Sequence, residues 1–138
     1  MHTIKAIILK SIPHSEQQQI LHVYSEERGY MQMITPLALF KRKTNTSVQC
    51  MQIVEIEFIP NERGGLHKLK SLSPLVNTSA IYLDVDKMNI ALLWGEILNL
   101  VLRDSNPNPD LYEYIKTSVE YLNFTRDDVA NFNLLFLF

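Results

Sequence analysis

The residues best suited to chemistry form a short basic run in the middle of the chain. Lys41, Arg42 and Lys43 follow Phe40 and precede residues 44–47, which carry hydroxyl and amide side chains. Cations on a loop pair with phosphates without reading base sequence, and hydroxyl and amide groups are common phosphate donors. The run therefore predicts a contact with nucleic acid. The alternative is a solvated loop that is polar only for solubility.

Four further lysines could extend this surface over neighbouring strands: Lys5, Lys10, Lys68 and Lys70. Lys68 and Lys70 are two positions apart, so a strand would place both on one face, where they could act together. The alternative is a set of scattered, solvated lysines. Arg28 and Arg63 lie beside acids in turns, and we interpret them as partners of those acids.

Aromatic side chains that could stack on bases are few in this part of the chain. Stacking is worth about 1–3 kcal/mol per base. Phe40, beside the basic run, is the best candidate, whereas Phe58 alternates with the inward residues of a strand and is expected in the core. Tyr24 and Tyr30 flank a turn and are expected to be at best half-exposed. We therefore expect DNA binding that is led by electrostatics and weakens with salt.

Side chains that could support catalysis or hold a metal are poorly placed for either. The internal histidines show neither ligand spacing nor an orienting partner: His14, His22 and His67. Cys50 has no base near it in the sequence, and no glycine loop that could cradle a phosphate is present. Glu55 and Glu57 share a strand face, which is conceivable for paired carboxylates but more typical of a solvated face. We expect no enzyme activity and no cofactor.

Charge is divided unevenly between the two halves of the chain. The 138 residues carry a net charge of −2, but residues 1–72 hold nine Lys/Arg and six Asp/Glu, a net +3, and residues 73–138 hold four and nine, a net −5. No apolar stretch approaches the ~20 residues of a membrane span. With one cysteine the chain has no internal disulfide. The length fits one domain, or two small ones that share a core, and the cytoplasm is the default location.

The basic half reads as five short strands with turn residues between them. Strands are predicted over residues 3–11, 19–25, 30–35, 52–59 and 66–72, the first one stopping before Pro13. Gly29 can supply the positive φ of a turn, and residues 60–65 have the composition of a hairpin loop. This order favours a five-stranded Greek-key barrel of the OB type. An SH3-like barrel or a small open sheet would give nearly the same pattern.

The acidic half changes to a helical period. Asp84 or Asp86 can cap a helix that ends before residues 106–109, and Asn108 can cap a second helix with Pro109 in its first turn. The helical repeat predicts a buried face on the first of these helices: Met88, Ala91, Leu92, Ile97, Leu98, Val101 and Leu102. Trp94 is expected in the core. Residues 125–128 resemble a third helix cap, and the apolar residues 134–138 suggest a helix that is cut, so we interpret the chain as a fragment.

The order of these segments resembles the RecO family of bacterial recombination mediators. The matching features are Lys5–Leu9, Ser15-Glu16, residues 25–29 (SEERG), residues 54–58 (VEIEF) and residues 64–75 (GGLHKLKSLSPL). Residues 108–113 and 129–132 resemble the helical region of the family, particularly in its Bacteroidetes branch. The family has a basic, glycine-containing stretch where this chain has residues 36–39 (PLAL), so the path of the loop is a point of difference.

The resemblance implies an OB domain over residues 1–78, followed by the start of an α-helical domain over residues 79–138. It implies a mediator that binds single- and double-stranded DNA, helps strands anneal, and loads recombinase onto DNA coated by single-stranded DNA-binding protein. The implied partners are RecR, the C-terminal tail of that coating protein, and the recombinase RecA indirectly. Many members carry a four-cysteine zinc motif in a later region, which this chain does not contain. The alternative is a protein-interaction barrel with little direct DNA binding.

Overall fold

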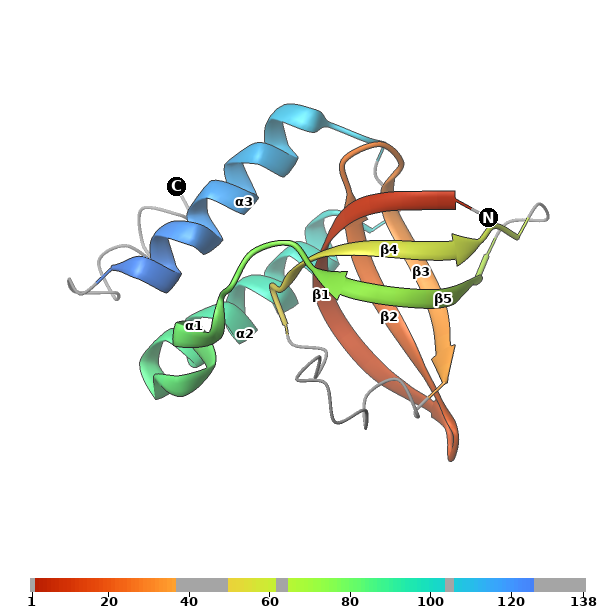
Figure 1. Cartoon of the computed structure of the whole chain (residues 1–138), viewed down its shortest axis with the longest axis horizontal. Helices are drawn as coiled ribbons and strands as arrows, with labels where there is room; N and C mark the ends of the chain where they lie inside the picture. Colours follow the sequence, from red (N-terminus) through yellow and green to blue (C-terminus); the bar gives the residue numbers. More distant parts are fainter. Residues whose placement is uncertain (1, 37–49, 62–64, 104–105, 126–138) are drawn as a thin grey trace.

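Five strands close into a barrel, and helices pack against one side of it (Figure 1). The computed structural model describes residues 2–36, 50–61, 65–103 and 106–125. The strands are β1 (His2–Ser15), β2 (Gln18–Ser25), β3 (Gly29–Pro36), β4 (Ile53–Ile59) and β5 (His67–Pro74), and the helices of the described residues are α1 (Ser79–Leu83), α2 (Val85–Val101) and α3 (Pro109–Phe124). The prediction of a five-stranded barrel followed by a helical region is confirmed.

The strand order around the barrel is β1-β2-β3-β5-β4, and β1 closes it by pairing with both β2 and β4. The pairing of β3 with β5 is short and parallel, with Met33 opposite His67 and Ile34 opposite Lys68. This connectivity is that of an OB-fold rather than of an open sheet. Alternate side chains of the strands fill the interior: Ile4, Ala6, Ile8, Leu21, Val23, Met31, Met33, Val54, Ile56, Phe58 and Leu69.

β1 continues past the proline at which we expected it to stop. Pro13 lies in the strand and pairs with Gln19 of β2. A proline has no backbone N–H to donate to a neighbouring strand. An edge strand tolerates this loss, because one of its two sides has no neighbouring strand to bond with. β4 pairs only with residues 2–7 of β1, so the far half of β1 has β2 as its only paired strand among the described residues.

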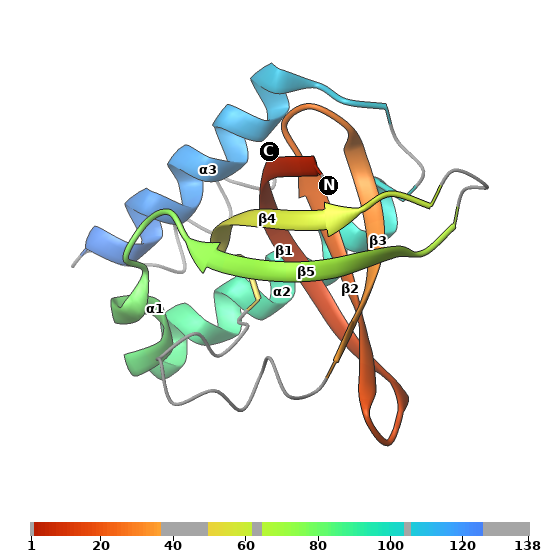
Figure 2. The ribbon, with the colours of Figure 1, turned by 45° about the vertical axis from the view of Figure 1, so that its right-hand side comes forward.

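A second apolar cluster joins the outer face of the barrel to the helices. It takes Ile7 and Leu9 from β1, Tyr24 from β2 and Ile53 from β4, and packs them against α1, α2 and α3. Trp94 of α2 is fully buried in this cluster, as predicted. Figures 1 and 2 both show α2 crossing behind β1. The outer face of the barrel and the helices therefore share this second cluster, while the first fills the barrel alone.

α2 approaches β1 closely at Gly95. A methyl group at this position would lie 2.3 Å from the Cys50 sulfur and 2.4 Å from the Leu9 carbonyl oxygen. The Cys50 thiol also donates to the Leu9 carbonyl, at 3.2 Å, and to the Ala91 carbonyl of α2, at 3.3 Å. Only a glycine leaves room for this contact between the helix and the strand.

The predicted caps begin both long helices. The Asp84 side chain accepts from two backbone N–H groups of α2, at 2.9 and 3.3 Å, and the Asn108 side chain accepts from the Leu111 N–H at 3.2 Å, with Pro109 opening α3. α1 was not predicted, because five residues are too few to show a helical period. The third predicted helix falls on residues 126–138, outside the described residues.

The periodicity assigned part of the buried face of α2 wrongly. Met88, Leu92 and Val101 are exposed, although the helical repeat placed them in the core. The buried side instead includes Trp94 and Lys87, whose ammonium donates to a backbone carbonyl of α3 at 3.2 Å. α2 is apolar on nearly all sides, so the pattern alone could not select the face that packs against the barrel.

Candidate nucleic-acid interface

Two of the predicted lysines share the outer face of β5. Lys68 and Lys70 are both exposed and lie on either side of the buried Leu69. Leu69 pairs with Phe58 and Ser71 with Glu57, so Lys70 is the extra residue of a β-bulge. Because both side chains are exposed on the outside of the barrel, they could contact one nucleic-acid strand together.

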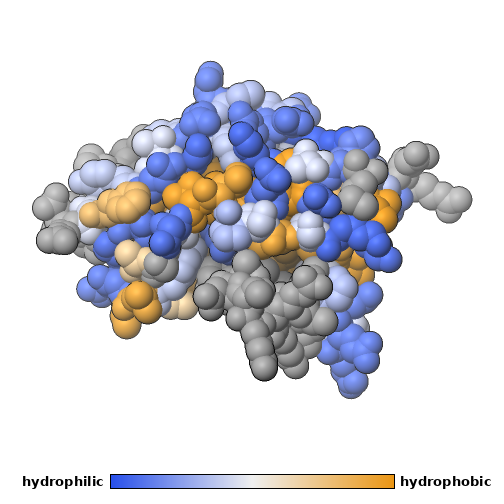
Figure 3. Space-filling view, viewed as in Figure 1, coloured by the Kyte–Doolittle hydropathy of each residue, from blue (hydrophilic) through white to orange (hydrophobic). Residues whose placement is uncertain are grey.

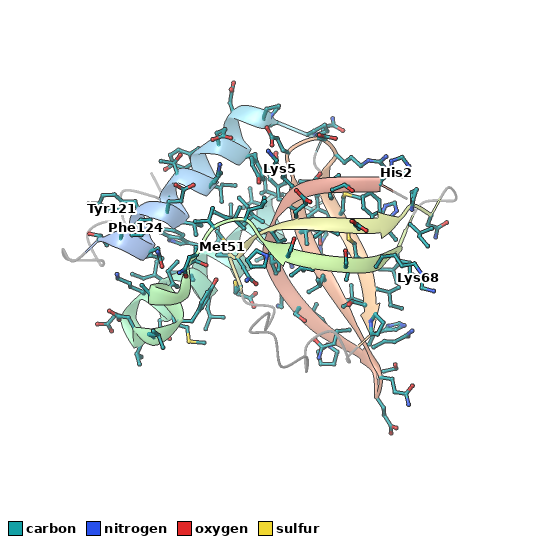
Figure 4. All side chains as sticks on the ribbon, in the orientation of Figure 1. His2, Lys5, Met51, Lys68, Tyr121 and Phe124 are labelled. Atoms are coloured by element: carbon teal, nitrogen blue, oxygen red, sulfur yellow. The ribbon has the colours of Figure 1, made fainter. Side chains whose placement is uncertain are left out.

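Lys5 lies apart from the β5 lysines. Figure 4 shows Lys5 next to α3 and Lys68 near the opposite end of the barrel. Lys5 is opposite Glu55 on β4, and it lines a cavity of about 260 Å³ with Glu26, Tyr112 and other residues of the seam between barrel and α3. Two lysines and two glutamates line this cavity, so its charge is balanced.

Lys10 already has a partner within the protein. Its ammonium lies 2.8 Å from a carboxylate oxygen of Glu96, which ties β1 to α2. Both side chains are partly exposed, at 35% and 56%, so solvent screens the pair. A phosphate would have to compete with Glu96 for this ammonium.

Two acids lie on the same outer surface of the barrel as the lysines. Glu57 is exposed and Glu55 is half-buried, both on β4, which lies between β1 and β5. Cross-strand neighbours of opposite charge attract, so these acids weaken the field of the nearby lysines. The surface around β4 is therefore mixed in charge.

The basic run itself falls in the connection between β3 and β4. Phe40, Lys41, Arg42 and Lys43 lie outside the described residues. β3 ends at Pro36 and the description resumes at Cys50, before β4. The role of the run stays a prediction from the sequence.

A cluster that the sequence did not suggest lies at the end of the barrel where β1 begins. The guanidinium carbon of Arg28, in the turn between β2 and β3, lies 5.3 Å from the centre of the Phe58 ring. The centre of the His67 ring lies 5.5 Å from the centre of the Phe58 ring, with the two rings nearly perpendicular, and the centre of the His2 ring lies 5.8 Å from it. Phe58 is fully buried, as predicted. We call Arg28, His2 and His67, the three groups around Phe58, the barrel-end cluster.

The interpretation of Arg28 as a partner of neighbouring acids is not what the structure shows. Within the described residues, no carboxylate lies within ion-pair distance of this guanidinium. The cluster was missed because His2, Arg28, Phe58 and His67 are far apart in the sequence and only barrel closure brings them together. Arg63 lies outside the described residues.

Polar side chains of β2, β3 and α2 form a buried network under the helices. The Tyr30 hydroxyl contacts His22 Nδ1 and donates to the Asn99 side chain at 3.1 Å, and Gln32 approaches both groups from β3. His22 is buried, and burial lowers the pKa of its imidazole, with Arg103 and Lys10 adding to the effect. The network therefore ties α2 to the barrel through the Tyr30–Asn99 hydrogen bond, and the fold favours the neutral form of His22 beside it.

The described residues offer little for catalysis or metal binding. No group of three or more His, Cys, Asp or Glu side chains among them is arranged to hold a metal ion. Burial raises the pKa of the Cys50 thiol to about 12, so the thiol stays protonated and donates its hydrogen within the fold. With this one cysteine, the chain does not supply the four thiolates of the zinc motif.

The helical side of the protein carries exposed apolar side chains. Leu83 is 86% exposed, Val85 74% and Phe124 71%. Figure 3 shows apolar side chains at the surface on the helical side of the molecule. We call the set on α1 and α2 the α1–α2 apolar surface: Leu83, Val85, Met88, Leu92, Leu93, Leu100 and Val101. Among the described helices, none is both long and apolar enough to cross a membrane.

Comparison with known proteins gives one consistent answer. Residues 1–78 match the family model described as "Recombination protein O N terminal". DNA repair protein RecO of Flavobacterium johnsoniae is 26% identical over 96% of the chain, that of Christiangramia forsetii 29% over 99%, and that of Syntrophobacter fumaroxidans 31% over 97%. The chain spans 57%, 58% and 53% of the lengths of these relatives, respectively.

Proposed function

The chain belongs to the RecO family of DNA repair proteins, and from that premise we propose that it is the DNA-binding part of a recombination mediator. It would bind single- and double-stranded DNA without sequence specificity, help strands anneal, and help load recombinase onto DNA coated by single-stranded DNA-binding protein. Residues 1–78 would form the DNA-binding OB domain, and residues 79–138 the start of the helical domain. Annealing requires no catalysis and no cofactor, because neutralising the phosphate charges lets two strands approach each other and pair.

The observation that carries this proposal is the OB barrel that the family model covers. OB barrels bind oligonucleotides on the face of their second and third strands and through the loops between strands 1 and 2 and between strands 4 and 5. Lys68 and Lys70 are exposed on β5, which follows the β4–β5 loop and pairs with β3, so they supply charge beside this loop. The predicted contribution of Lys41, Arg42 and Lys43 lies in the β3–β4 connection. Phe58 and Tyr24 are fully buried and are not available for stacking, which favours binding through phosphates rather than bases.

The test is a titration of a fluorescent single-stranded oligonucleotide at two salt concentrations. We expect affinity to fall steeply with salt, since each phosphate neutralised on a single strand contributes about 0.7 to the slope of log affinity against log salt. Replacing Lys41, Arg42 and Lys43 by Ala should weaken binding, and so should the pair Lys68→Ala and Lys70→Ala. Lys116→Ala on α3 is the control. Absence of binding at low salt would contradict the proposal.

A second candidate function is favoured by the α1–α2 apolar surface. Exposed apolar side chains commonly mark protein docking sites, and these belong to α1 and α2 rather than to the outer face of β5. The proposed partners are RecR and the C-terminal tail of single-stranded DNA-binding protein, with RecA engaged indirectly. Leu92→Glu should weaken binding of a fluorescent tail peptide without changing DNA affinity. Loss of DNA affinity alone would argue against separate surfaces.

The proposed location follows from the proposed function. A protein that handles chromosomal DNA in a bacterium works in the cytoplasm, at the nucleoid. Fluorescence microscopy of a tagged chain should show signal over the nucleoid that increases after DNA damage. Signal confined to the cell envelope would contradict this location.

A further inference from the structure

We infer that the barrel-end cluster, formed by Arg28, His2 and His67 around Phe58, is a binding site for one phosphate group of a nucleic-acid backbone. The inference rests on the proposed function, because it names where on the barrel the backbone would be held. It adds a site that the lysines of the sequence pattern did not include.

The Arg28 side chain is held in place while its hydrogen-bond donors stay available. Its guanidinium lies over the Phe58 ring at 5.3 Å, a distance at which the cation is attracted to the face of the ring. A guanidinium has five N–H donors, and a contact with an aromatic ring does not occupy them as an ion pair would, so they can meet a phosphate in pairs. Within the described residues no carboxylate pairs with Arg28, although Glu27 lies on the same turn.

His67 presents a second donor at the same place. Its Nδ1 accepts from the Asn61 backbone N–H at 3.0 Å, so in the neutral ring the proton is on Nε2. The ring packs against Phe58 at 5.5 Å, nearly perpendicular to it, which fixes its orientation. Burial and the positive charge of Arg28 lower the pKa of His67. A bound phosphate would oppose that effect and favour the charged imidazole.

The remaining groups around the cluster are mostly basic. His2 approaches Phe58 from β1 at 5.8 Å, and Lys68 follows His67 on β5 with its side chain exposed. Figure 4 shows His2 and Lys68 at the same end of the barrel. From β4, Glu57 faces the outside of the barrel between Thr3 and Ser71, not the ring of Phe58.

A phosphate suits this arrangement better than a planar anion. The donors come from three separate segments, the β2–β3 turn and the first residues of β1 and β5, so they approach the site from different directions. A tetrahedral group with several acceptor oxygens can accept from all of them at once. Lys68 and Lys70 then continue from this end along β5, where the next phosphates of the strand would pass.

The first test needs no variant and no DNA. Imidazole NMR signals of the whole chain are followed against pH, with and without inorganic phosphate. We expect phosphate to shift the His67 and His2 signals and to raise the pKa of His67. His14, exposed in the far half of β1, is the control and should not respond. Equal responses of all histidines, or none, would overturn the site.

The second test uses the fluorescent single-stranded oligonucleotide. Arg28→Met keeps an apolar contact with Phe58 and removes the charge, and Arg103→Met removes the same charge from an exposed arginine on the helical side. We expect Arg28→Met to weaken binding by about threefold to tenfold and to reduce the salt slope by about 0.7, with a much smaller effect of Arg103→Met. Equal effects of the two variants would overturn the site.

The two tests separate this inference from the proposed function. If phosphate moves the His67 signal but the chain binds no DNA at low salt, the cluster binds phosphate but not a nucleic-acid backbone, and the proposed function fails. If the chain binds DNA and Arg28→Met behaves like Arg103→Met, the proposed function stands and the site fails.

Discussion

The contact at Gly95 makes the sharpest prediction about stability. In an exposed helix, replacing glycine by alanine stabilises by about 0.5–1 kcal/mol. Here the new methyl group would lie 2.4 Å from the Leu9 carbonyl oxygen and 2.3 Å from the Cys50 sulfur, so α2 must move away from β1. Overpacking of this kind costs about 1–3 kcal/mol. We expect Gly95→Ala to lower the free energy of unfolding by about 2 kcal/mol.

Trp94 makes this loss easy to measure. It is the only tryptophan of the chain, and it is fully buried next to Gly95 in the cluster shared by barrel and helices. Urea unfolding followed by its fluorescence should show a midpoint about 1 M lower for Gly95→Ala, given a slope near 2 kcal/mol per M. Far-ultraviolet circular dichroism should give the same midpoint if the shared core unfolds as one unit.

Two further variants separate the contact from helix propensity. Asn89→Ala, at an exposed position of α2, should stabilise slightly, because alanine is the better helix former. The double variant Gly95→Ala with Cys50→Ala lacks the sulfur but keeps the Leu9 carbonyl. Its free energy of unfolding should therefore fall by less than the sum of the decreases in the two single variants. A Gly95→Ala protein as stable as the unchanged chain would refute the close-contact argument.

Three other predictions concern single side chains. Folding lowers the pKa of His22, so the contribution of its neutral form to the free energy of unfolding should be fully present above the ordinary pKa of 6.5 and decrease as the pH falls below that value. Thermal unfolding between pH 7.5 and 5 measures this decrease, and His22→Gln should make it smaller. Cys50 is partly buried and its pKa is raised to about 12, so at neutral pH it should react with a thiol reagent much more slowly than a free cysteine, and rapid labelling of the native chain would contradict a protonated thiol. Asp84→Ala removes the cap of α2 and should cost about 1 kcal/mol in urea unfolding, whereas Asp84→Asn should cost less.

The barrel was well predicted because its strands carry strong local signals. Alternation of Val54, Ile56 and Phe58 with polar neighbours identifies the inward face of β4, and the turn at Gly29 separates β2 from β3. The proline in β1 misled the prediction, since a proline argues against a strand only where both edges are paired. Helix caps are also local signals, so Asp84 and Asn108 were identified from their sequence neighbours alone.

The site was predicted only in its exposed lysines. Lys68 and Lys70 share a face because their spacing requires it, but the partner of Lys10 is Glu96, 86 residues away, which no local pattern reveals. The face of α2 could not be chosen either, because leucines occur on nearly all its sides. The interpretation of Arg28 failed for a related reason: sequence neighbours suggested an ion pair, and the fold supplied an aromatic ring.

The sequence by itself determined the five strands, the two long helices, the division into a basic and an acidic half, and the family. Those properties depend on residues close together in the chain, or on the order of segments along it. The tertiary structure decided which groups meet: Arg28, His2 and His67 around Phe58, and Gly95 against Leu9 and Cys50. Barrel closure creates the first set of contacts, because β1 must pair with both β2 and β4 before distant segments can share one end of the barrel. The packing of α2 on β1 creates the second.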